Sequence, residues 1–538
     1  PAQAGGLAPD LQAQINANPL AARPTRVIVR FTLSGLDAGL LALLFGGAAL
    51  TDLPLVNGVV MVLPQNVLPA LSAMDCVAWI SPDRGIGARG DFDTEATGAT
   101  AVWSAPGHRG TGVRVAVLDT GVYGGTAEWS RYGASTSRLV AFKDMVNDRS
   151  LPYDDNGHGT HVAGIVLGSG SQSGGAVTGT APDADLVAVK VLGKDGSGSV
   201  STVIKGIDWC IRRKSTLNIR VLNLSLGHAP GESAATDPLC EAVRRAVRAG
   251  LVVVVAAGNR GKGSSGQTVY GGIECPGNEP SALTVGALNT FETAARTDDG
   301  VATYSSRGPT RIDGLPKPDL VAPGNKIVSV RAPGSALDVA YPQNGVNAGA
   351  GAAGAEYFQL SGTSMAAPQV AGIVALMLQA NGSLAPNTVK GILMYTAERL
   401  ELRDSQGQAL APGLSYLAQG AGSVNALGAV EVAGRINGSA PAGAAWLQGA
   451  LSHGSTIAGT PFAWAGQVIW RNRILTGEAL LGIRQVVWSD QITWSDQITW
   501  SDQITWSDQI TWSDQITWSD QITWSDQITW SDQITWSD

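Results

Sequence analysis

The sequence predicts an α/β protein with a mainly parallel sheet, preceded by a ferredoxin-like α+β unit and followed by a hexapeptide-repeat tail. Three observations support this prediction. Short apolar runs alternate with helix-period segments between about Thr94 and Gly434, a β-α-β-β-α-β order precedes them, and a six-residue motif repeats at the end of the chain. Continuous apolar strands that are separated by helices indicate a parallel sheet covered on both faces.

The strands of the expected parallel sheet are four apolar runs rich in valine. They are residues 113–118, 186–189, 221–224 and 251–255. In sheets of this kind, residues that bind ligands or perform chemistry gather at the carboxyl ends of the strands. We therefore look for functional side chains directly after these runs.

The N-terminal unit, residues 23–89, alternates short strands and helices. We expect a strand at 27–29, an apolar helix within 38–50, a strand pair around 55–62, a helix at 66–74 and a strand at 77–80. That order is the ferredoxin-like arrangement. Segment 38–50 is too short to span a bilayer, so we expect it to belong to a buried helix and expect no transmembrane segment.

The two ends of the chain lie outside these units. Residues 1–22 contain Ala2-Gln3-Ala4, which has the small-x-small form of a signal-peptidase site, so we expect a leader remnant there. Residues 435–487 form a C-terminal extension, and residues 488–538 carry a tail with eight tandem copies of Gln-Ile-Thr-Trp-Ser-Asp. Such repeats could form stacked strands or a solenoid-like coil, or be a tract expanded by replication slippage.

The net charge of −8 comes from this tail. The tail holds nine Asp and no Lys or Arg, so residues 1–487 carry a net charge of +1. A nearly neutral body without a basic cluster gives no electrostatic reason to expect nucleic acid as a partner.

The chain has four cysteines, at Cys76, Cys210, Cys240 and Cys275. No two of them form a CxxC pair, which argues against a zinc site. One disulfide among the last three and free buried thiols are both compatible with the sequence.

Two candidate catalytic residues stand where the predicted fold would place them. Asp119 directly follows the run at 113–118, and a carboxylate at a strand's end can accept a hydrogen bond from an imidazole. His158 opens a helix in the glycine-framed motif at 156–164, which also contains His161. Two histidines three apart also suggest metal ligands, but no Glu lies between them and no third ligand follows at zincin spacing, so a metal is not expected.

The most specific motif of the chain surrounds Ser364. It lies in Ser361-Gly362-Thr363-Ser364-Met365-Ala366-Ala367-Pro368, at the start of an apolar helix, where the helix dipole and free N–H groups stabilise developing negative charge. Asn259 follows the run at 251–255, and its amide could join the Ser364 backbone N–H in binding an oxyanion. On its own, Asn259 could equally close a turn.

Together these residues resemble the subtilase family of serine peptidases, in which the triad follows the chain order Asp, His, Ser. The resemblance covers about residues 101–400, and its detail is similar to the AprX-like bacterial branch. The motifs that carry this detail are residues 153–158, 218–227 and 304–310.

The resemblance implies a subtilisin-like three-layer fold for residues 90–434 and a serine endopeptidase that is secreted or lies at the cell surface. It implies a catalytic triad of Asp119, His158 and Ser364, with Asn259 in the oxyanion hole. No cofactor is then required for catalysis.

The same resemblance implies that residues 23–89 are an inhibitory propeptide that assists folding and is then cut off. The expected cut falls near Arg89-Gly90, with Arg84 as a second option. The expected partners are protein or peptide substrates and the chain's own propeptide, and we expect a monomer.

The resemblance also places substrate-binding residues near the nucleophile. Two extended segments would flank the substrate backbone, and three small residues would form a wall of the S1 pocket. The flanking residues are Ser225, Leu226, Gly227, Gly196, Ser197 and Gly198, and the wall is Ala256, Ala257 and Gly258. Glu274 aligns with the floor of S1, where a carboxylate would favour Lys or Arg at P1; a solvated glutamate at the rim is the alternative.

Many subtilases bind structural calcium, but the loop that would carry the tight site, residues 168–179, contains no Asp, Glu or Asn. We therefore do not predict that site, although Asp154, Asp155 or Asp195 could serve weaker ones. A glycine- and alanine-rich insertion at 331–356 precedes the nucleophile and could border the cleft, or be an inert loop.

A second class of function remains open on the sequence alone. The chain could be a surface-binding or assembly protein in which the repeat tail does the work and the catalytic unit only processes or anchors it.

Overall fold

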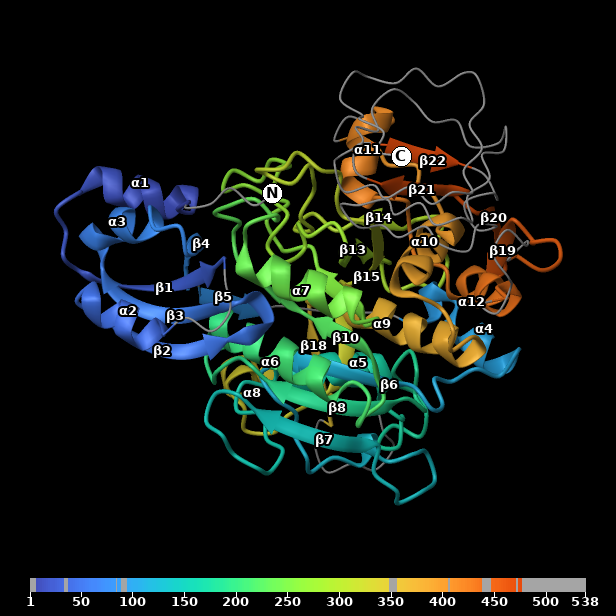
Figure 1. Cartoon of the computed structure of the whole chain (residues 1–538). Coiled ribbons are helices and arrows are strands. Elements are labelled where there is room, and N and C mark those ends of the chain that lie inside the picture. Colours follow the sequence, from blue (N-terminus) through green and yellow to red (C-terminus); the bar gives the residue numbers. More distant parts are fainter. Residues whose placement is uncertain are drawn as a thin grey trace, which may run out of the picture.

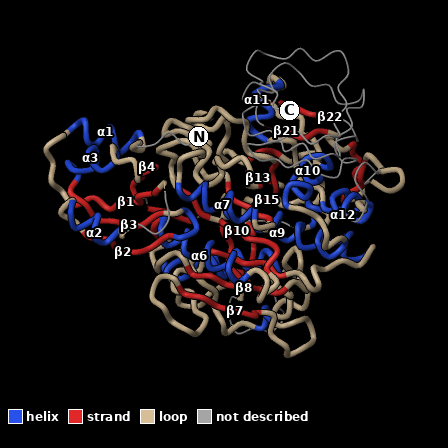
Figure 2. Tube along the Cα trace, in the orientation of Figure 1, coloured by secondary structure: helices blue, strands red, loops and turns tan. Residues whose placement is uncertain are grey.

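A computed structural model gives the arrangement of the chain (Figure 1, Figure 2). It describes residues 6–32, 37–83, 85–88, 94–347, 356–404, 407–437, 447–470 and 473–476. The repeat tail, Arg84 and the expected cut at Arg89-Gly90 lie outside the described residues.

An eight-stranded sheet, with the strands predicted from the apolar runs at its centre, forms the middle of the molecule. Its order is β14-β13-β12-β10-β6-β8-β7, and β15 pairs with β13. Within the described ranges each of these pairings is parallel except that of β13 with β14. The prediction of a mainly parallel sheet is therefore confirmed. The strands are β6 Arg114–Asp119, β7 Leu139–Asp144, β8 Asp185–Lys190, β10 Ile219–Leu224, β12 Val252–Ala256, β13 Leu283–Asn289, β14 Gly300–Val301 and β15 Leu320–Pro323.

Helices cover both faces of this sheet (Figure 1). Successive side chains of a strand point to opposite faces, and β6 buries both sets. Val115 and Val117 pack with α5 and α9, whereas Ala116 and Leu118 pack with α6 and α7. The four helices are α5 His158–Leu167, α6 Val200–Arg213, α7 Pro238–Arg248 and α9 Thr363–Ala380.

Helix α9 is the central core helix. Among the described residues it is the one helix long and apolar enough to cross a bilayer, but 89% of that stretch is buried inside the molecule. Its apolar composition is therefore explained by packing between the sheet, α5 and α12 (Ala426–Arg435). The helix begins at Thr363, which places Ser364 in its first turn.

The N-terminal unit is a separate four-stranded antiparallel sheet of order β2-β3-β1-β4. Residues 6–17 belong to it, because Leu11 and Ile15 of α1 are buried in the same core as β1 and β3. The elements are α1 Pro9–Ala17, β1 Pro24–Phe31, α2 Ala38–Leu44, β2 Ala48–Leu53, β3 Gly58–Pro64, α3 Leu68–Ser72 and β4 Val77–Pro82.

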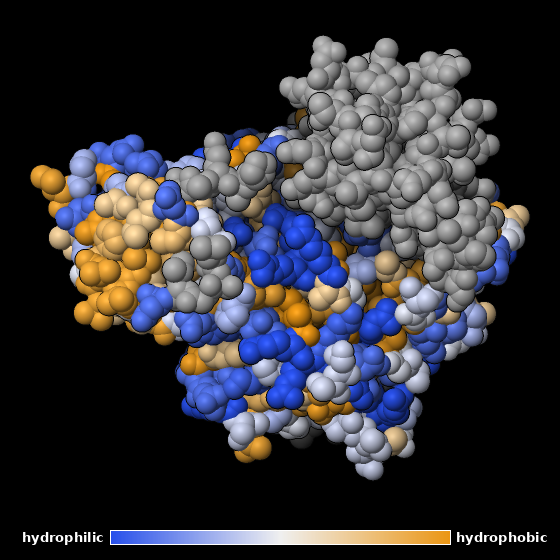
Figure 3. All heavy atoms as spheres, viewed as in Figure 1, coloured by the Kyte–Doolittle hydropathy of each residue, from blue (hydrophilic) through white to orange (hydrophobic). Residues whose placement is uncertain are grey.

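Segment 38–50 is not the buried helix that was expected. Helix α2 ends at Leu44, because Gly46 takes φ 72° and turns the chain into β2. Leu43 and Leu44 are 74% and 73% exposed, while Ala38 and Ala42 face the core. Figure 3 shows the hydrophobic surface that gathers over this N-terminal unit.

The N-terminal sheet packs against α6 and α7. Ile28 and Val60 share a core cluster with these two helices. The carboxylate of Asp83 accepts two hydrogen bonds from Ser201, one from the backbone N at 2.9 Å and one from Oγ at 2.6 Å. The chain continues into β5 Gly85–Ala88, which lies between β9 Ser197–Ser199 and β11 Leu226–Gly227, antiparallel to both.

The described part of the C-terminal extension continues the central core. Trp464 is 7% exposed and packs edge-on against Tyr395, with ring centroids 6.4 Å apart. Val468 and Ile469 join the same cluster. The remaining elements are α4 Ala99–Ser104, β16 Ile327–Val330, α8 Ala336–Ala340, β17 Gly345–Val346, β18 Tyr357–Leu360, α10 Pro386–Thr396, α11 Pro412–Gln419, α12 Ala426–Arg435, β19 Gly454–Ile457, β20 Thr460–Ala463, β21 Gln467–Trp470 and β22 Arg473–Thr476.

Candidate active site

The first of the predicted site residues ends a central strand at the carboxyl edge of the sheet. Asp119 is the last residue of β6 and is 1% exposed. Its Oδ1 accepts from the backbone N of Thr120 at 2.7 Å and lies 2.7 Å from Nδ1 of His158. An ionised carboxylate only accepts, so Nδ1 carries the proton in this bond. The Nε2 atom of the neutral ring is then a proton acceptor.

His158 is held by the start of α5. The preceding residue, Gly157, has φ 105°, a backbone conformation that favours glycine. This turn aims the imidazole, which is 2% exposed, at the strand-end carboxylate of Asp119. The glycine-framed motif therefore places the histidine as predicted.

Asp154 fixes the loop that carries His158, a role that sequence reasoning missed although the residue lies in the quoted motif. Its Oδ1 accepts from Thr120 Oγ1 at 2.9 Å and from the backbone N of Gly157 at 2.8 Å. Its Oδ2 accepts from the N and Oγ1 of Thr160, at 2.8 and 2.6 Å. Burial raises the pKa of this carboxyl, and the same hydrogen bonds oppose that rise. The residue thus ties the strand end at Asp119 to the histidine turn.

The insertion at 331–356 also touches this loop in its described part. The backbone N of Ala336 donates to Asp155 O and that of Leu337 to Asn156 O, both at 2.9 Å. The insertion therefore packs directly on the turn before His158.

His161 has a structural environment and not that of a metal ligand. It is fully buried, and its Nε2 lies 2.9 Å from the backbone O of Phe358. Burial, together with the nearby His158, lowers the pKa of His161 to about 3. A neutral ring that donates from Nε2 to a backbone carbonyl accounts for the burial of this histidine.

Ser364 sits in the first turn of α9 and is 3% exposed. Its backbone O accepts from Ser225 Oγ at 2.5 Å, and Asn223 Nδ2 donates to that same hydroxyl at 2.9 Å. Because α5 and α9 pack together and both start at the carboxyl edge of the sheet, the serine turn and the histidine turn belong to one region.

Asn259 is oriented by the residue before Ser364. Its Oδ1 accepts from the backbone N of Thr363 at 2.9 Å, and Thr363 Oγ1 accepts from the backbone N of Gly258 at 3.0 Å. Since the amide oxygen is engaged by Thr363, the amide NH2 points the other way. Thr363 was missed by sequence reasoning, although it stands in the quoted serine motif.

A pocket of about 810 Å³ brings most of the predicted site residues together. The predicted residues in its wall are Gly196, Ser197, Leu226, Gly227, Ala256, Gly258, Asn259, Glu274 and Ser364. Ser225 does not line it but is buried behind Ser364, and Gly198 instead pairs with β5. Sequence reasoning missed other wall residues, among them His228, Arg260 and Lys262.

Glu274 lies in this pocket but is not a free carboxylate. Its side chain is 16% exposed and forms an ion pair with Arg260, whose side chain is 59% exposed. A Cβ added at Gly258 would come within 2.6 Å of Glu274 Cγ, so the glycine leaves the space that this side chain fills. The carboxylate thus lies in the wall next to Gly227 and Gly258, with its partner at the rim.

The segments predicted to flank a substrate hold a strand of the chain itself. In β5, Gly87 pairs with both Ser197 and Gly227, and Ala88 pairs with Leu226. The groove between β9 and β11 therefore accepts an extended backbone by strand addition.

The loop at 168–179 is filled by a carboxylate from elsewhere in the chain. Glu128 is fully buried, and its oxygens accept from the backbone N of Gly170 at 2.6 Å, the backbone N of Gln172 at 2.8 Å and Tyr357 OH at 2.6 Å. N–H groups that converge on one point suit an anion and repel a cation. The loop therefore does not fit a calcium ion.

Each of the three acidic residues considered for weaker calcium sites already binds other groups of the chain, and the three do not share a partner. Both oxygens of Asp154 accept hydrogen bonds in the histidine loop, Asp155 pairs with Lys190 Nζ at 2.7 Å, and Asp195 accepts from Ser197 N at 3.0 Å. Among the described residues, the side chains whose ligand atoms lie close enough together to hold a metal ion are at another place. They are His228, Asp237 and Cys275.

We expect Glu128→Ala to lower the free energy of unfolding by about 3 kcal/mol, because it leaves two buried N–H groups and a hydroxyl without an acceptor. Glu128→Gln keeps the shape and one acceptor oxygen, so its loss should be about half as large. Urea unfolding of both variants, made in an inactive Ser364→Ala chain, measures the difference. A loss below about 0.5 kcal/mol for Glu128→Ala would contradict this role of the carboxylate.

A buried carboxylate–histidine pair at a strand end, a serine at a nearby helix start and a groove that binds extended backbone are the features of a serine peptidase. The sequence profile of the subtilase family (peptidase S8) matches residues 110–422. The chain therefore belongs to the subtilase family of serine peptidases, which hydrolyse peptide bonds.

Three relatives illustrate the match. Serine protease AprX from Bacillus subtilis (strain 168) is 41% identical over 371 residues, which are 68% of this chain and 77% of AprX. Subtilisin DY from Bacillus licheniformis is 33% identical over 296 residues, 55% of this chain and 87% of its own. The structure of fervidolysin from Fervidobacterium pennivorans is 23% identical, covers 77% of this chain and 61% of its own, and has a TM-score of 0.56, which supports the fold alone. The predicted family and its AprX-like detail are confirmed.

Proposed function

We propose that this subtilase is an endopeptidase in which Ser364 is the nucleophile, His158 the general base and Asp119 the residue that orients the base. The observation that carries the proposal is the buried 2.7 Å contact between Asp119 Oδ1 and His158 Nδ1, at the edge of the sheet where α9 presents Ser364 to the pocket. The contact fixes the tautomer that such a reaction needs.

In the proposed reaction, Ser364 Oγ attacks the scissile carbonyl carbon while its proton moves to His158 Nε2. Asp119 stabilises the imidazolium that forms. The carbonyl oxygen becomes an oxyanion, which the Asn259 amide and the Ser364 backbone N–H would bind. Collapse breaks the C–N bond, the imidazolium gives its proton to the leaving amine, and water then hydrolyses the acyl-enzyme by the same steps.

Substrates would bind as β5 does. An extended peptide between β9 and β11 makes main-chain hydrogen bonds that do not depend on its sequence. Specificity would then come from the pocket, which suits an enzyme with protein and peptide substrates.

We further propose that residues 23–89 are an inhibitory propeptide with a ferredoxin-like fold. The antiparallel order β2-β3-β1-β4, the packing of this sheet on α6 and α7, and the position of β5 in the substrate groove support this proposal. A segment that fills the groove excludes other substrates until it is removed.

The register of β5 supports a cut after Arg89. Gly87 pairs with Gly227 and Ala88 with Leu226, so the next residue of a peptide in this register would be opposite Ser225. Ser225 contacts the backbone of Ser364. In the chain's own sequence that next residue is Arg89, and the bond to Gly90 would be the one cleaved.

A preference for basic P1 residues would follow from Glu274. A P1 arginine could replace Arg260 as the partner of this carboxylate, because Arg260 lies at the rim and is more than half exposed. A charge pair inside the pocket would then distinguish Arg or Lys from Leu.

Cleavage of matched peptides that differ only at P1, Arg, Lys or Leu, tests both the activity and the preference. We expect the mature protein to cleave after Arg, and Glu274→Gln to lower the Arg-to-Leu ratio of kcat/KM about tenfold or more, since a desolvated charge pair is lost. Arg260→Ala is the matched control and should raise that ratio, because it removes the competing cation.

The outcomes separate the two parts of the proposal. No cleavage of any peptide by the mature protein argues against the peptidase, whereas cleavage with a ratio that Glu274→Gln leaves unchanged argues only against the basic P1 preference.

Secretion to the outside or the surface of the cell is part of the proposal and is supported by the family resemblance. The comparisons match the peptidase unit and do not support the alternative of a surface-binding or assembly protein that works through its repeat tail.

A further inference from the structure

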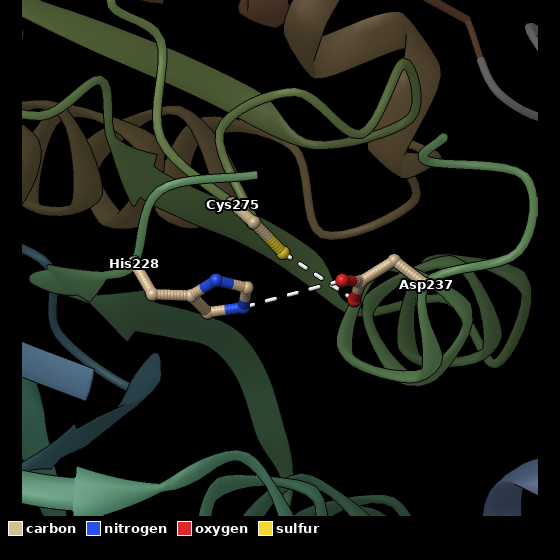
Figure 4. A group of neighbouring side chains, drawn as sticks. All are labelled: His228, Asp237 and Cys275. Atoms are coloured by element: carbon tan, nitrogen blue, oxygen red, sulfur yellow. Dashed lines mark hydrogen bonds and ion pairs between the residues drawn. The ribbon is translucent and has the colours of Figure 1, made fainter. Parts of the chain in front are cut away.

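Three segments meet behind the wall of the substrate pocket and bring four side chains together, three of which, His228, Asp237 and Cys275, are drawn in Figure 4. His228 follows β11, Asp237 and Cys240 lie at the start of α7, and Cys275 follows Glu274. The backbones of His228 and Cys275 are joined by two hydrogen bonds of 3.0 and 2.8 Å. All four side chains are buried, with His228 the most exposed at 6%.

The ligand atoms of His228, Asp237 and Cys275 all lie within 4.8 Å of one another, and Cys240 approaches this group through Cys275. The Sγ atoms of Cys240 and Cys275 are 3.5 Å apart, and Cys275 Sγ lies 3.4 Å from Asp237 Oδ1. Nε2 of His228 lies 4.0 Å from Asp237 Oδ2. All four cysteines of the chain lie within the described residues and are free, so the two thiols are close without forming the disulfide that the sequence left open.

The contacts of His228 indicate which of its two ring nitrogens is available to a ligand. Its Nδ1 lies 2.9 Å from the backbone O of Ala229, which only accepts, so Nδ1 carries the ring proton. Nε2 of the neutral ring is then an acceptor. It is buried, has no hydrogen-bond partner among the described residues, and faces an oxygen of the Asp237 carboxylate. Nε2 and the carboxylate oxygen can therefore both bind one cation placed between them, either a proton or a metal ion.

The set of donors identifies the kind of cation. Two thiols, an imidazole and a carboxylate are the ligands that Zn²⁺ takes in tetrahedral sites. Two sulfurs bound to one zinc stand about 3.8 Å apart, given Zn–S bonds of about 2.3 Å, and the observed 3.5 Å is close to this. The hydrogen bond from His228 Nδ1 to a backbone carbonyl is the outer contact that orients metal-binding histidines.

We propose that Cys240, Cys275, His228 and Asp237 bind a zinc ion behind the substrate pocket. Without metal the thiols stay protonated at neutral pH, since burial raises the pKa of Cys240 to about 12. Binding therefore displaces the two thiol protons into solvent. The absence of a CxxC pair hid this site in the sequence, because the fold joins cysteines that are 35 residues apart.

A metal ion bound here would hold in place two of the segments that form the wall of the substrate pocket. His228 is the neighbour of Gly227 and itself lines the pocket, and Cys275 is the neighbour of Glu274. The ion would tie both segments to the start of α7. Zinc is therefore expected to stabilise the pocket and to raise the thermal midpoint of the protein.

The test uses the full-length chain with Ser364→Ala, which avoids self-digestion, reduced and freed of metal under nitrogen. Co²⁺ is the probe, because a thiolate-bound tetrahedral cobalt gives a charge-transfer band and intense visible bands. We expect one equivalent of Co²⁺ to produce these bands, and Zn²⁺ to abolish them by displacement. Zn²⁺ should also raise the thermal midpoint.

Variants locate the site. Cys240→Ser, Cys275→Ser and His228→Gln should each weaken Co²⁺ binding at least tenfold. Cys210→Ser is the matched control, since Cys210 is a buried free thiol of α6 outside the cluster, and it should bind like the parent. His228→Gln keeps both thiols and remains informative if a serine variant does not fold.

Three results would overturn the proposal. They are no cobalt bands in the reduced parent, bands that survive in His228→Gln and Cys275→Ser, or a metal-free protein as isolated in which mass spectrometry finds Cys240 and Cys275 joined as a disulfide.

Discussion

The Ser364→Ala chain is expected to accumulate as an uncut precursor, with a loss of peptidase activity on the order of 10⁶ in kcat, the size known for the corresponding serine of subtilisin. The change removes only the hydroxyl of the proposed nucleophile, because alanine keeps the Cβ of this buried residue in the first turn of α9. Mass spectrometry of the protein as produced gives the measurement: the active chain should begin at Gly90, and the variant should retain residues 23–89.

Ser361→Ala is the matched control, since it removes a hydroxyl three residues away that is exposed and outside the pocket wall. It should mature like the parent. Addition of a small amount of active enzyme should then cut the Ser364→Ala precursor at the same bond. Maturation of Ser364→Ala at the normal rate and without such an addition would exclude Ser364 as the nucleophile.

The sequence predicted those parts of the site that follow from local position. Asp119 ends an apolar strand, His158 opens a helix after a glycine turn, and Ser364 opens an apolar helix, so each could be placed by its neighbours in the chain. The parallel sheet then brings strand ends and helix starts to one edge, which is a property of the fold class and not of these residues.

What the sequence did not predict depends on partners far apart in the chain. Glu128 fills a loop that begins 40 residues later, and its charge is needed there only because the folded loop directs its N–H groups inward. Arg260 pairs with Glu274, and Cys240 approaches Cys275, for the same reason. No local pattern in the sequence, either of polarity or of residue spacing, predicts such pairs.

For segment 38–50 the sequence instead predicted burial that the structure does not have. Its apolar composition indicated burial, but the turn at Gly46 ends the helix early, and α2 buries Ala38 and Ala42 and packs Leu41 against the core while its other leucines are exposed. Composition thus overestimated the buried surface, because a helix of this length presents one narrow face to a sheet.

Asp119→Asn is expected to lower kcat by about 10⁴ while the protein still folds and binds substrate, as the same change does in another serine peptidase. The carboxylate now accepts from His158 Nδ1, which leaves Nε2 able to take the serine proton. An amide NH2 in that place would donate to Nδ1 and shift the ring proton to Nε2. The ring then has no acceptor for the nucleophile. Steady-state kinetics on the peptide with Arg at P1 should therefore show a loss in kcat with KM little changed.

Asp155→Asn provides the comparison, because Asp155 stands in the histidine loop but pairs with Lys190 and not with His158. The same exchange of acid for amide should there lower kcat less than about tenfold, because the amide oxygen can still accept from the buried Lys190 Nζ, which also donates to the backbone O of Thr120. A fluorophosphonate that labels the serine adds a second measurement: labelling of Asp119→Asn should slow in step with kcat, while Asp155→Asn should react like the parent. Equal losses in the two variants would mean that Asp119 acts by shaping the loop, and that the tautomer of His158 is set by another group.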